Sequence, residues 1–134
     1  MRFSLFSALI VTLSSGFFVQ ASPLAAQVVW TPKILSPNTT TIWVAGEKEM
    51  VIWDTADTPP DVSNAGLVQI FKGPALTSEF NLVAQKGSIQ VTVPLDLMAD
   101  VYQIVLFGDS GNISPPFHIC TKTGYGDHLD CANW

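Results

Sequence analysis

Short apolar runs alternate with turn-forming residues along this chain, and this alternation constrains its fold more than any other feature. Between residues 31 and 119 the runs are rich in β-branched and aromatic residues. Pro, Gly, Asn or Asp recur between them at intervals of roughly a dozen residues. No stretch keeps a helical period over three turns. We therefore predict an all-β fold, an immunoglobulin- or fibronectin-like two-sheet β-sandwich of about seven strands.

One of the expected strands, Glu49–Asp54, alternates between two faces, as side chains on a strand do. Val51 and Trp53 share the face that we expect to lie in the core. Met50 and Ile52 share the opposite face. This strand therefore predicts both a register and a direction for the core.

A second expected strand, Val101–Phe107, is apolar at nearly every position, which predicts a place at the centre of a sheet. The stretch before it, Pro94–Asp100, is expected to be a connection with room for one helical turn. The remaining expected strands are Lys33–Pro37 at an edge, Thr41–Ala45, Leu67–Lys72, Phe80–Gln85, Ser88–Val93 and, as the closing strand, Phe117–Ile119.

Residues 1–21 have the pattern of a secretory signal peptide. Arg2 provides the basic start, Phe3–Leu13 provides the apolar run, and Val19 and Ala21 provide the small residues before the cut. The 113 residues that follow suit one small domain. We divide them into a flexible lead-in at 22–30, a sandwich domain at 31–119 and a C-terminal tail at 120–134.

The charge after residue 21 limits the partners of the protein. Five lysines and no arginine stand against eleven acidic residues, which leaves a net charge of −6. This balance argues against nucleic acid and against anionic lipid, which both require basic side chains. Neither a membrane-length apolar run nor a hydrophobic C-terminal tail follows the signal. We therefore expect a secreted, soluble protein with a neutral or cationic partner, such as a neutral polysaccharide.

Two kinds of modification agree with secretion. Cys120 and Cys131 are the only cysteines, and in an oxidising compartment such a pair predicts a disulfide that closes the tail. A metal site formed by these cysteines with His118 or His128 is the alternative. Two sequons predict N-glycosylation at Asn38 and at Asn112, although Pro115 directly follows the second sequon.

Several segments follow one another in an order that is typical of one family. They are Ile34–Pro37, Thr41–Gly46 with its Trp-x-Ala-Gly turn, Val51–Trp53, Tyr102–Leu106, and, after a Ser-Gly-Asn turn, Ser114–Ile119. Through them the stretch from about residue 31 to 119 resembles the fungal Kre/Knh-type cell-wall domain. That domain also occurs in Ser/Thr-rich, glycolipid-anchored surface proteins.

The resemblance implies an immunoglobulin-like sandwich, a fungal source and an extracellular or cell-wall setting. The founding members of the family are tied to β-1,6-glucan assembly and offer no catalytic residues to transfer. This chain departs from the pattern in its lack of a Ser/Thr-rich stalk and an anchor signal, which favours a freely secreted form. The cysteine-closed tail also lies outside the family pattern.

The candidate binding residues are tryptophans, because an aromatic face can stack on a sugar ring. We expect Trp30, Trp43 and Trp134 to contact a glycan; burial in the core is an equal alternative for each of them. We expect Trp53 to be buried. The segment around Ser110 resembles the nucleophile motif of trypsin-like proteases, but no histidine precedes it, so we interpret it as a hairpin turn.

We predict no catalytic residues, no cofactor and no metal site; Asp127, His128 and Asp130 read as a solvated tail. The leading interpretation is a small, secreted, non-catalytic protein of the fungal cell wall that binds or helps to organise β-glucan. The alternative is an interaction protein, such as an effector or inhibitor, that binds an extracellular protein. A glycan-acting enzyme is the third interpretation, with no carboxylate pair singled out.

Overall fold

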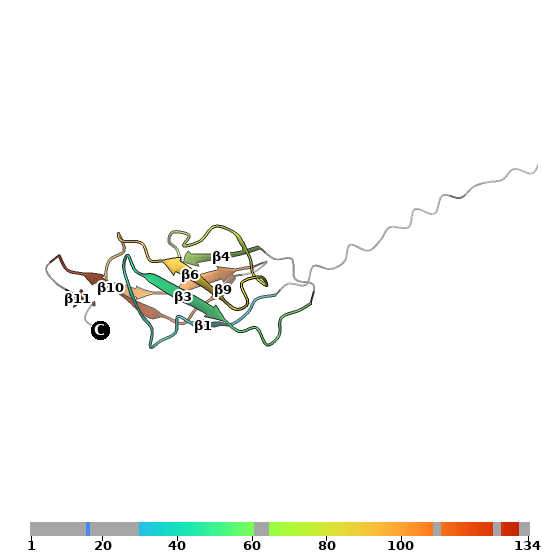
Figure 1. Cartoon of the computed structure of the whole chain (residues 1–134), viewed down its shortest axis with the longest axis horizontal. Helices are drawn as coiled ribbons and strands as arrows, with labels where there is room; N and C mark the ends of the chain where they lie inside the picture. Colours follow the sequence, from blue (N-terminus) through green and yellow to red (C-terminus); the bar gives the residue numbers. More distant parts are fainter. Residues whose placement is uncertain (1–15, 17–29, 61–64, 109–110, 125–126, 132–134) are drawn as a thin grey trace, which may run out of the picture.

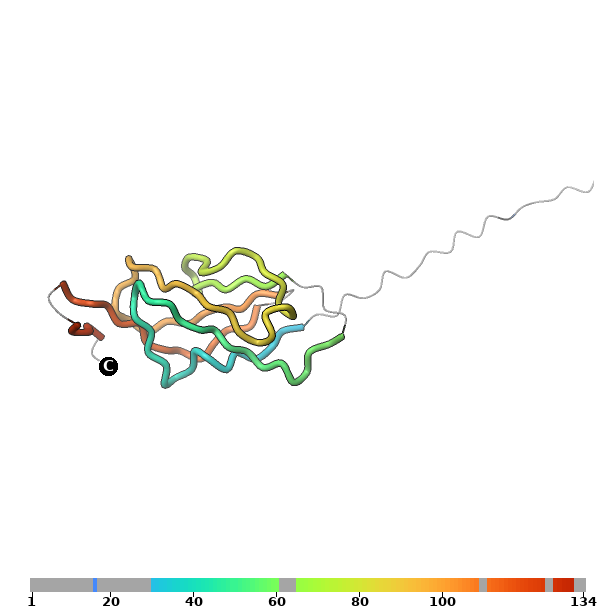
Figure 2. Tube along the Cα trace, viewed as in Figure 1, coloured from blue at the N-terminus to red at the C-terminus, as the bar shows by residue number. Residues whose placement is uncertain are grey.

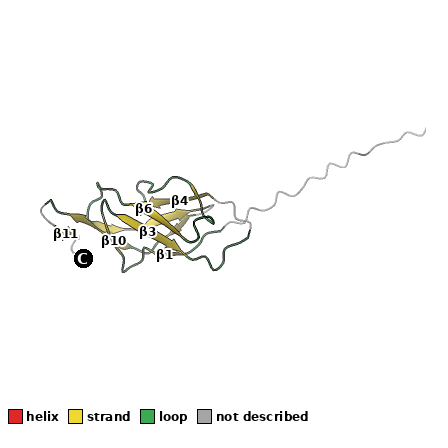
Figure 3. Ribbon diagram, viewed as in Figure 1, coloured by secondary structure: helices red, strands yellow, loops and turns green. Residues whose placement is uncertain are grey.

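All regular structure in the described part of the chain is β-strand. The computed structural model describes residue 16 and residues 30–60, 65–108, 111–124 and 127–131. Within these ranges there are eleven strands and no helix. Figure 3 shows the strands in yellow and the loops that join them in green. The strands form three sheets around one apolar core. The predicted all-β, sandwich-like fold is confirmed, whereas the immunoglobulin type stays a prediction.

The first sheet has the order β1-β3-β6 and is antiparallel throughout. Its strands are β1 (Ile34–Ser36), β3 (Lys48–Trp53) and β6 (Ser88–Thr92). β1 is an edge strand, as predicted. Val51 and Trp53 of β3 are buried, while Met50 and Ile52 are about 40% exposed, so the predicted alternation is confirmed.

The second sheet is built around β10 (Phe117–Lys122), which pairs with three other strands. β2 (Ile42–Val44) runs parallel to it, and β7 (Asp100–Tyr102) and β11 (Leu129–Asp130) run antiparallel. The predicted closing strand, Phe117–Ile119, is therefore too short, because β10 continues to Lys122 and β11 follows it.

The third sheet has the order β5-β4-β8-β9. It contains β5 (Phe80–Asn81), β4 (Ala65–Ile70), β8 (Ile104–Phe107) and β9 (Gly111–Ile113). β8 lies between β4 and β9, so the prediction of a central strand is confirmed for the second half of Val101–Phe107. The first half is β7, which belongs to the second sheet. Gln103 separates the two halves, and its side chain donates to the Ser114 carbonyl at 2.9 Å.

Two other expectations need correction. The predicted strand Phe80–Gln85 ends after Asn81, because the Asn81 Oδ1 accepts the N–H groups of Val83 and Ala84, each at 3.0 Å, and turns the chain. The predicted connection Pro94–Asp100 is a turn and loop with no helical turn, and its last residue, Asp100, already belongs to β7. The predicted hairpin residues Asp109 and Ser110 lie outside the described residues.

One core joins the three sheets. Trp43 of β2 meets Phe117 of β10 edge-on, with ring centroids 4.7 Å apart, and Trp53 of β3 stacks on Phe80 of β5 at 6.1 Å. The molecule is elongated, and the segment before β1 (blue) and the β10–β11 pair lie at opposite ends of its long axis (Figure 1, Figure 2).

Candidate functional site

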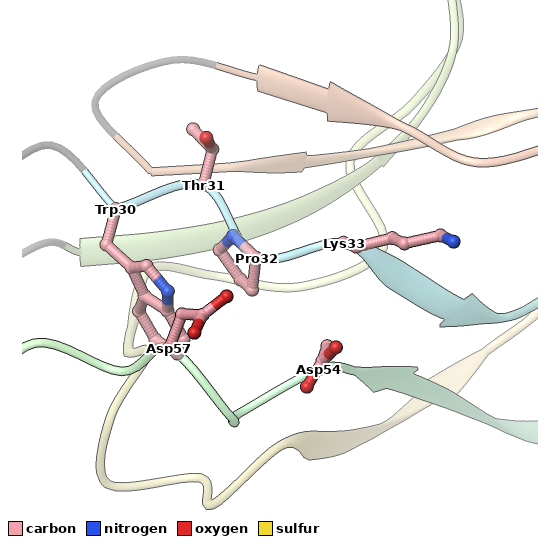
Figure 4. Close-up of a pocket in the computed structure, with 6 residues that line it drawn as sticks. All are labelled: Trp30, Thr31, Pro32, Lys33, Asp54 and Asp57. Carbon is pink, nitrogen blue, oxygen red and sulfur yellow. The ribbon is translucent and has the colours of Figure 1, made fainter.

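A pocket lies where the chain enters the sandwich, beside the end of β3. It is lined by six residues and has a volume of about 300 Å³ (Figure 4). We call it the Trp30 pocket, and its lining residues are Trp30, Thr31, Pro32, Lys33, Asp54 and Asp57. These residues come from only two segments, the one before β1 and the one after β3.

The pairing of β1 with β3 explains why these two segments meet. Ile34 lies opposite Trp53, so the residues just outside the pair, Lys33 and Asp54, are neighbours. The Asp54 N–H donates to the Lys33 carbonyl at 2.8 Å and extends the pairing by one bond. Beyond that bond the two segments separate. The pocket therefore follows from the register of β1 and β3.

The wall of the pocket combines an aromatic ring with two carboxylates. Trp30 is 6% exposed and belongs to the core cluster, and Pro32 is also buried. Asp54 and Asp57 are exposed. Figure 4 shows the carboxylate of Asp57 beside the indole of Trp30, and the side chain of Lys33 extending away from both. An apolar floor thus meets acidic hydrogen-bond acceptors at the rim.

Two hydrogen bonds hold this wall in place. The Asp54 Oδ1 accepts the N–H of Ala56 at 2.9 Å, which fixes the carboxylate at the rim. The Asn112 Nδ2 of β9 donates to the Pro32 carbonyl at 2.7 Å, which ties the segment before β1 to the third sheet. In the sequence, Asn112 stands out only as part of a sequon, and no local pattern around it indicates this positioning role.

The sequon at Asn112 is engaged in the fold. Besides the bond from Asn112 to Pro32, the buried Ser114 Oγ accepts the Ile104 N–H at 3.0 Å and donates to the Pro115 carbonyl at 2.9 Å. At the other sequon, the Asn38 Oδ1 accepts from the N–H and the hydroxyl of Thr40 in an exposed turn. Glycosylation of Asn38 and of Asn112 stays a prediction.

The predicted tryptophan contacts need correction. Trp43 is 1% exposed and packs on Phe117, so the prediction that it contacts a glycan is wrong. Trp30 lines a pocket but offers no open ring face, since nearly all of its surface is buried. Trp53 is buried as predicted, and Trp134 lies outside the described residues. Trp30 and Trp43 are buried because the free energy gained when an apolar side chain leaves water grows with its area, which is largest for such rings.

The disulfide between Cys120 and Cys131 is confirmed, with Cα atoms 4.4 Å apart. The alternative metal site with cysteine ligands is therefore wrong. Within the part of the chain that the structure describes, no three His, Cys, Asp or Glu side chains gather as a metal site would require. The same part holds no helix with the length and apolar character needed to span a membrane.

Comparison of the chain with protein-family models, with curated proteins and with solved structures found no match.

Proposed function

We propose that this protein is a secreted, non-catalytic module of the fungal cell wall that binds a neutral glycan, of the β-glucan class, in the Trp30 pocket. The observation that carries the proposal is the meeting of the Trp30 indole with the carboxylates of Asp54 and Asp57 in one pocket. The C–H groups of a sugar pack against the few indole atoms of Trp30 that remain accessible, without stacking on the ring face, while its hydroxyl groups donate to the two carboxylates.

The size and charge of the pocket support a neutral ligand. A volume of about 300 Å³ is at the lower end of the range for small-molecule sites, which suits one or two sugar rings rather than a long buried chain. The two carboxylates would repel an anionic polysaccharide. The net charge of the whole chain, −5, acts in the same direction at longer range.

Binding without hydrolysis agrees with the surroundings of the two carboxylates. A glycosidase needs one carboxyl group that stays protonated, and burial in an apolar site commonly provides this. Asp54 and Asp57 are both exposed to water. We therefore assign them to recognition of hydroxyl groups.

Secretion is part of the proposal and is supported by the disulfide, since such bonds persist in oxidising compartments. The test uses the full chain, expressed with its own leader in a fungal host. Protein recovered from the medium should begin at Ser22. Retention of an uncut chain inside the cells would contradict this part.

The binding test measures how much of the secreted protein is retained on insoluble β-1,3/1,6-glucan, chitin and cellulose, with an assay for released sugar. We expect retention on glucan and no sugar release. Asp57→Ala should weaken retention at least about tenfold, since a hydrogen bond to a charged group contributes about 1.5–3 kcal/mol. The matched control is Asp96→Ala, which removes an exposed carboxylate that does not line the pocket and should leave retention unchanged.

Three results would overturn the proposal. Retention on none of the polymers would exclude the glycan, and equal losses in the two aspartate variants would exclude the pocket. Sugar release that Asp57→Ala abolishes would replace binding by catalysis.

A further inference from the structure

A second hollow lies between the loop that joins β6 to β7 and the β10–β11 pair. Figure 1 shows these elements at the opposite end of the molecule from the segment before β1. It has a volume of about 390 Å³. We call it the Met98 groove, and its lining residues are Leu97, Met98, Ala99, Thr121 and Asp130. It shares no residue with the Trp30 pocket.

The loop on one side of the groove is anchored to the fold. The Tyr102 hydroxyl donates to the Met98 carbonyl at 2.8 Å, and Leu97 packs against the core. Burial raises the pKa of Tyr102, and the neighbouring charge of Asp100 raises it further, so the phenol keeps its proton and remains a donor at neutral pH. The backbone of this wall is therefore held in place before any partner arrives.

Two large apolar side chains of the anchored loop nevertheless lie in solvent. Leu95 is 82% exposed and Met98 is 77% exposed, the highest values among the large apolar side chains of the described residues. Val101 and Leu129 add further exposed apolar surface at this end, at 47% and 40%. Exposed apolar clusters on a fixed backbone mark interaction sites, and the flexible thioether of Met adapts to a partner.

The opposite wall is fixed by the disulfide. Thr121 pairs with Asp130, and Lys122 pairs with Leu129. The bond between Cys120 and Cys131 closes this short pair of strands next to Asp130. Asp130 is thus held at the rim of the groove.

The charge around the groove is predominantly negative. Asp130 lines the groove. Asp96 lies in the loop between β6 and β7, and Asp100 directly follows that loop. Asp127 precedes β11. The cations of this end are Lys122, whose ammonium pairs with Glu47, and Lys48, while His128 lies in the same C-terminal segment. The rim therefore attracts positive charge and repels a second copy of this chain, whose net charge is −5.

We propose that the Met98 groove binds a cationic peptide segment of another protein. An apolar side chain of that segment packs between Leu97 and Met98, and a neighbouring Lys or Arg pairs with Asp130. This interaction is separate from glycan binding, and the two sites lie at opposite ends, so the module can link a glycan to a protein.

The test begins with a random heptapeptide phage library selected on the immobilised full-length secreted protein. The selected sequences should carry Lys or Arg next to a Leu, Met or aromatic residue. A fluorescent copy of the best peptide is then titrated with each variant at low and at high salt. Met98→Ser should weaken its binding at least about tenfold, and Asp130→Asn should weaken it and reduce the salt dependence.

Matched controls separate the sites and the fold. Met50→Ser removes an equally large exposed side chain from the outer face of β3 and should leave peptide binding unchanged. Asp57→Ala should lower glucan retention alone, and Met98→Ser should lower peptide binding alone. Thermal unfolding of Met98→Ser should match that of the unaltered chain, since the side chain is exposed.

Two results would overturn the inference. One is selection of acidic peptides, or of peptides that bind Met98→Ser as well as the unaltered chain. The other is dimerisation in sedimentation experiments that Met98→Ser abolishes, because the groove would then be occupied by a second copy.

Discussion

At the scale of single residues, Asn112 connects parts of the chain that are 80 positions apart. Its amide donates to the Pro32 carbonyl from a half-buried position on β9. Pro32 lines the Trp30 pocket, whereas Asn112 does not. The hydrogen bond from Asn112 to Pro32 therefore helps to determine the shape of the pocket from outside it.

Asn112→Asp should therefore affect both stability and binding. A carboxylate cannot donate to a carbonyl, and the two oxygens would repel each other. We expect the free energy of unfolding to fall by about 1–3 kcal/mol, the cost of an unmade bond at a half-buried site. Glucan retention should fall as well. The Asn112→Asp variant and the unaltered chain are prepared in a host without N-glycosylation, and their unfolding in urea is followed by tryptophan fluorescence.

Asn112→Gln is the comparison for this prediction, because it also removes the sequon but keeps an amide donor. If Asn112→Asp and Asn112→Gln behave like the unaltered chain, the bond to Pro32 has no positioning role.

The tryptophans show what composition and pattern cannot resolve at this scale. Strand alternation predicted that Trp53 is buried, because its neighbours on β3 define two faces. No such pattern surrounds Trp30 or Trp43, whose exposure depends on which distant segments cover them. Trp43 is covered by Phe117, which is more than 70 residues away, and a single sequence gives no sign of that contact.

At the scale of elements, the outer strand β11 has only two residues and pairs with the end of β10. So short a pair contributes few backbone hydrogen bonds, and both of its residues are exposed. The disulfide that follows is therefore the main restraint on this wall of the Met98 groove.

Replacing both cysteines by alanine should lower the free energy of unfolding by about 3 kcal/mol, the chain-entropy effect of opening a loop of this length. The groove should also lose its fixed wall, so the selected cationic peptide should bind more weakly. Denaturant unfolding and peptide titration measure the two effects. Lys122→Ala, which breaks the exposed ion pair to Glu47, should change stability little. An unchanged peptide affinity without the disulfide would contradict the role given to β11.

Most of the expected strands exist, and the errors have local causes. The strand predicted at Phe80–Gln85 is apolar enough to continue, but the Asn81 side chain caps a turn inside it. The apolar run Val101–Phe107 is divided between two sheets at Gln103, and the run itself contains no breaker. The Trp30 pocket depends on the register of β1 against β3, and the Met98 groove depends on the β10–β11 pair. Periodicity predicts faces of strands, whereas both sites arise where paired strands end.

At the scale of the whole molecule, three sheets share one core. Its buried side chains come from β1, β2, β3, β4, β6, β8 and β10. No sheet has a separate core within the described residues, so each sheet depends on the others for burial of its apolar face. The domain should therefore unfold in one cooperative transition, with coincident curves from tryptophan fluorescence and far-UV circular dichroism.

Neighbouring residues of β3 test this architecture with one strand. Trp53 is 2% exposed and stacks on Phe80 of another sheet, whereas Ile52 is 40% exposed on the outer face. Trp53→Ala should lower the free energy of unfolding by about 3–5 kcal/mol, because it leaves a large cavity in the shared core. Ile52→Ala should cost less than about 1 kcal/mol. Denaturant unfolding measures both, with circular dichroism as the probe that does not depend on Trp53.

A shared core also predicts the shape of the unfolding transition of the Trp53→Ala variant. Because the cavity lies between sheets, the midpoint should fall for the whole transition, and no part of the domain should unfold separately. Similar losses for Ile52→Ala and Trp53→Ala would mean that β3 is shifted by one residue, which would exchange its two faces. That result would also displace Asp54 from Lys33 and remove the basis of the Trp30 pocket, so the register of this strand connects the core to the proposed function.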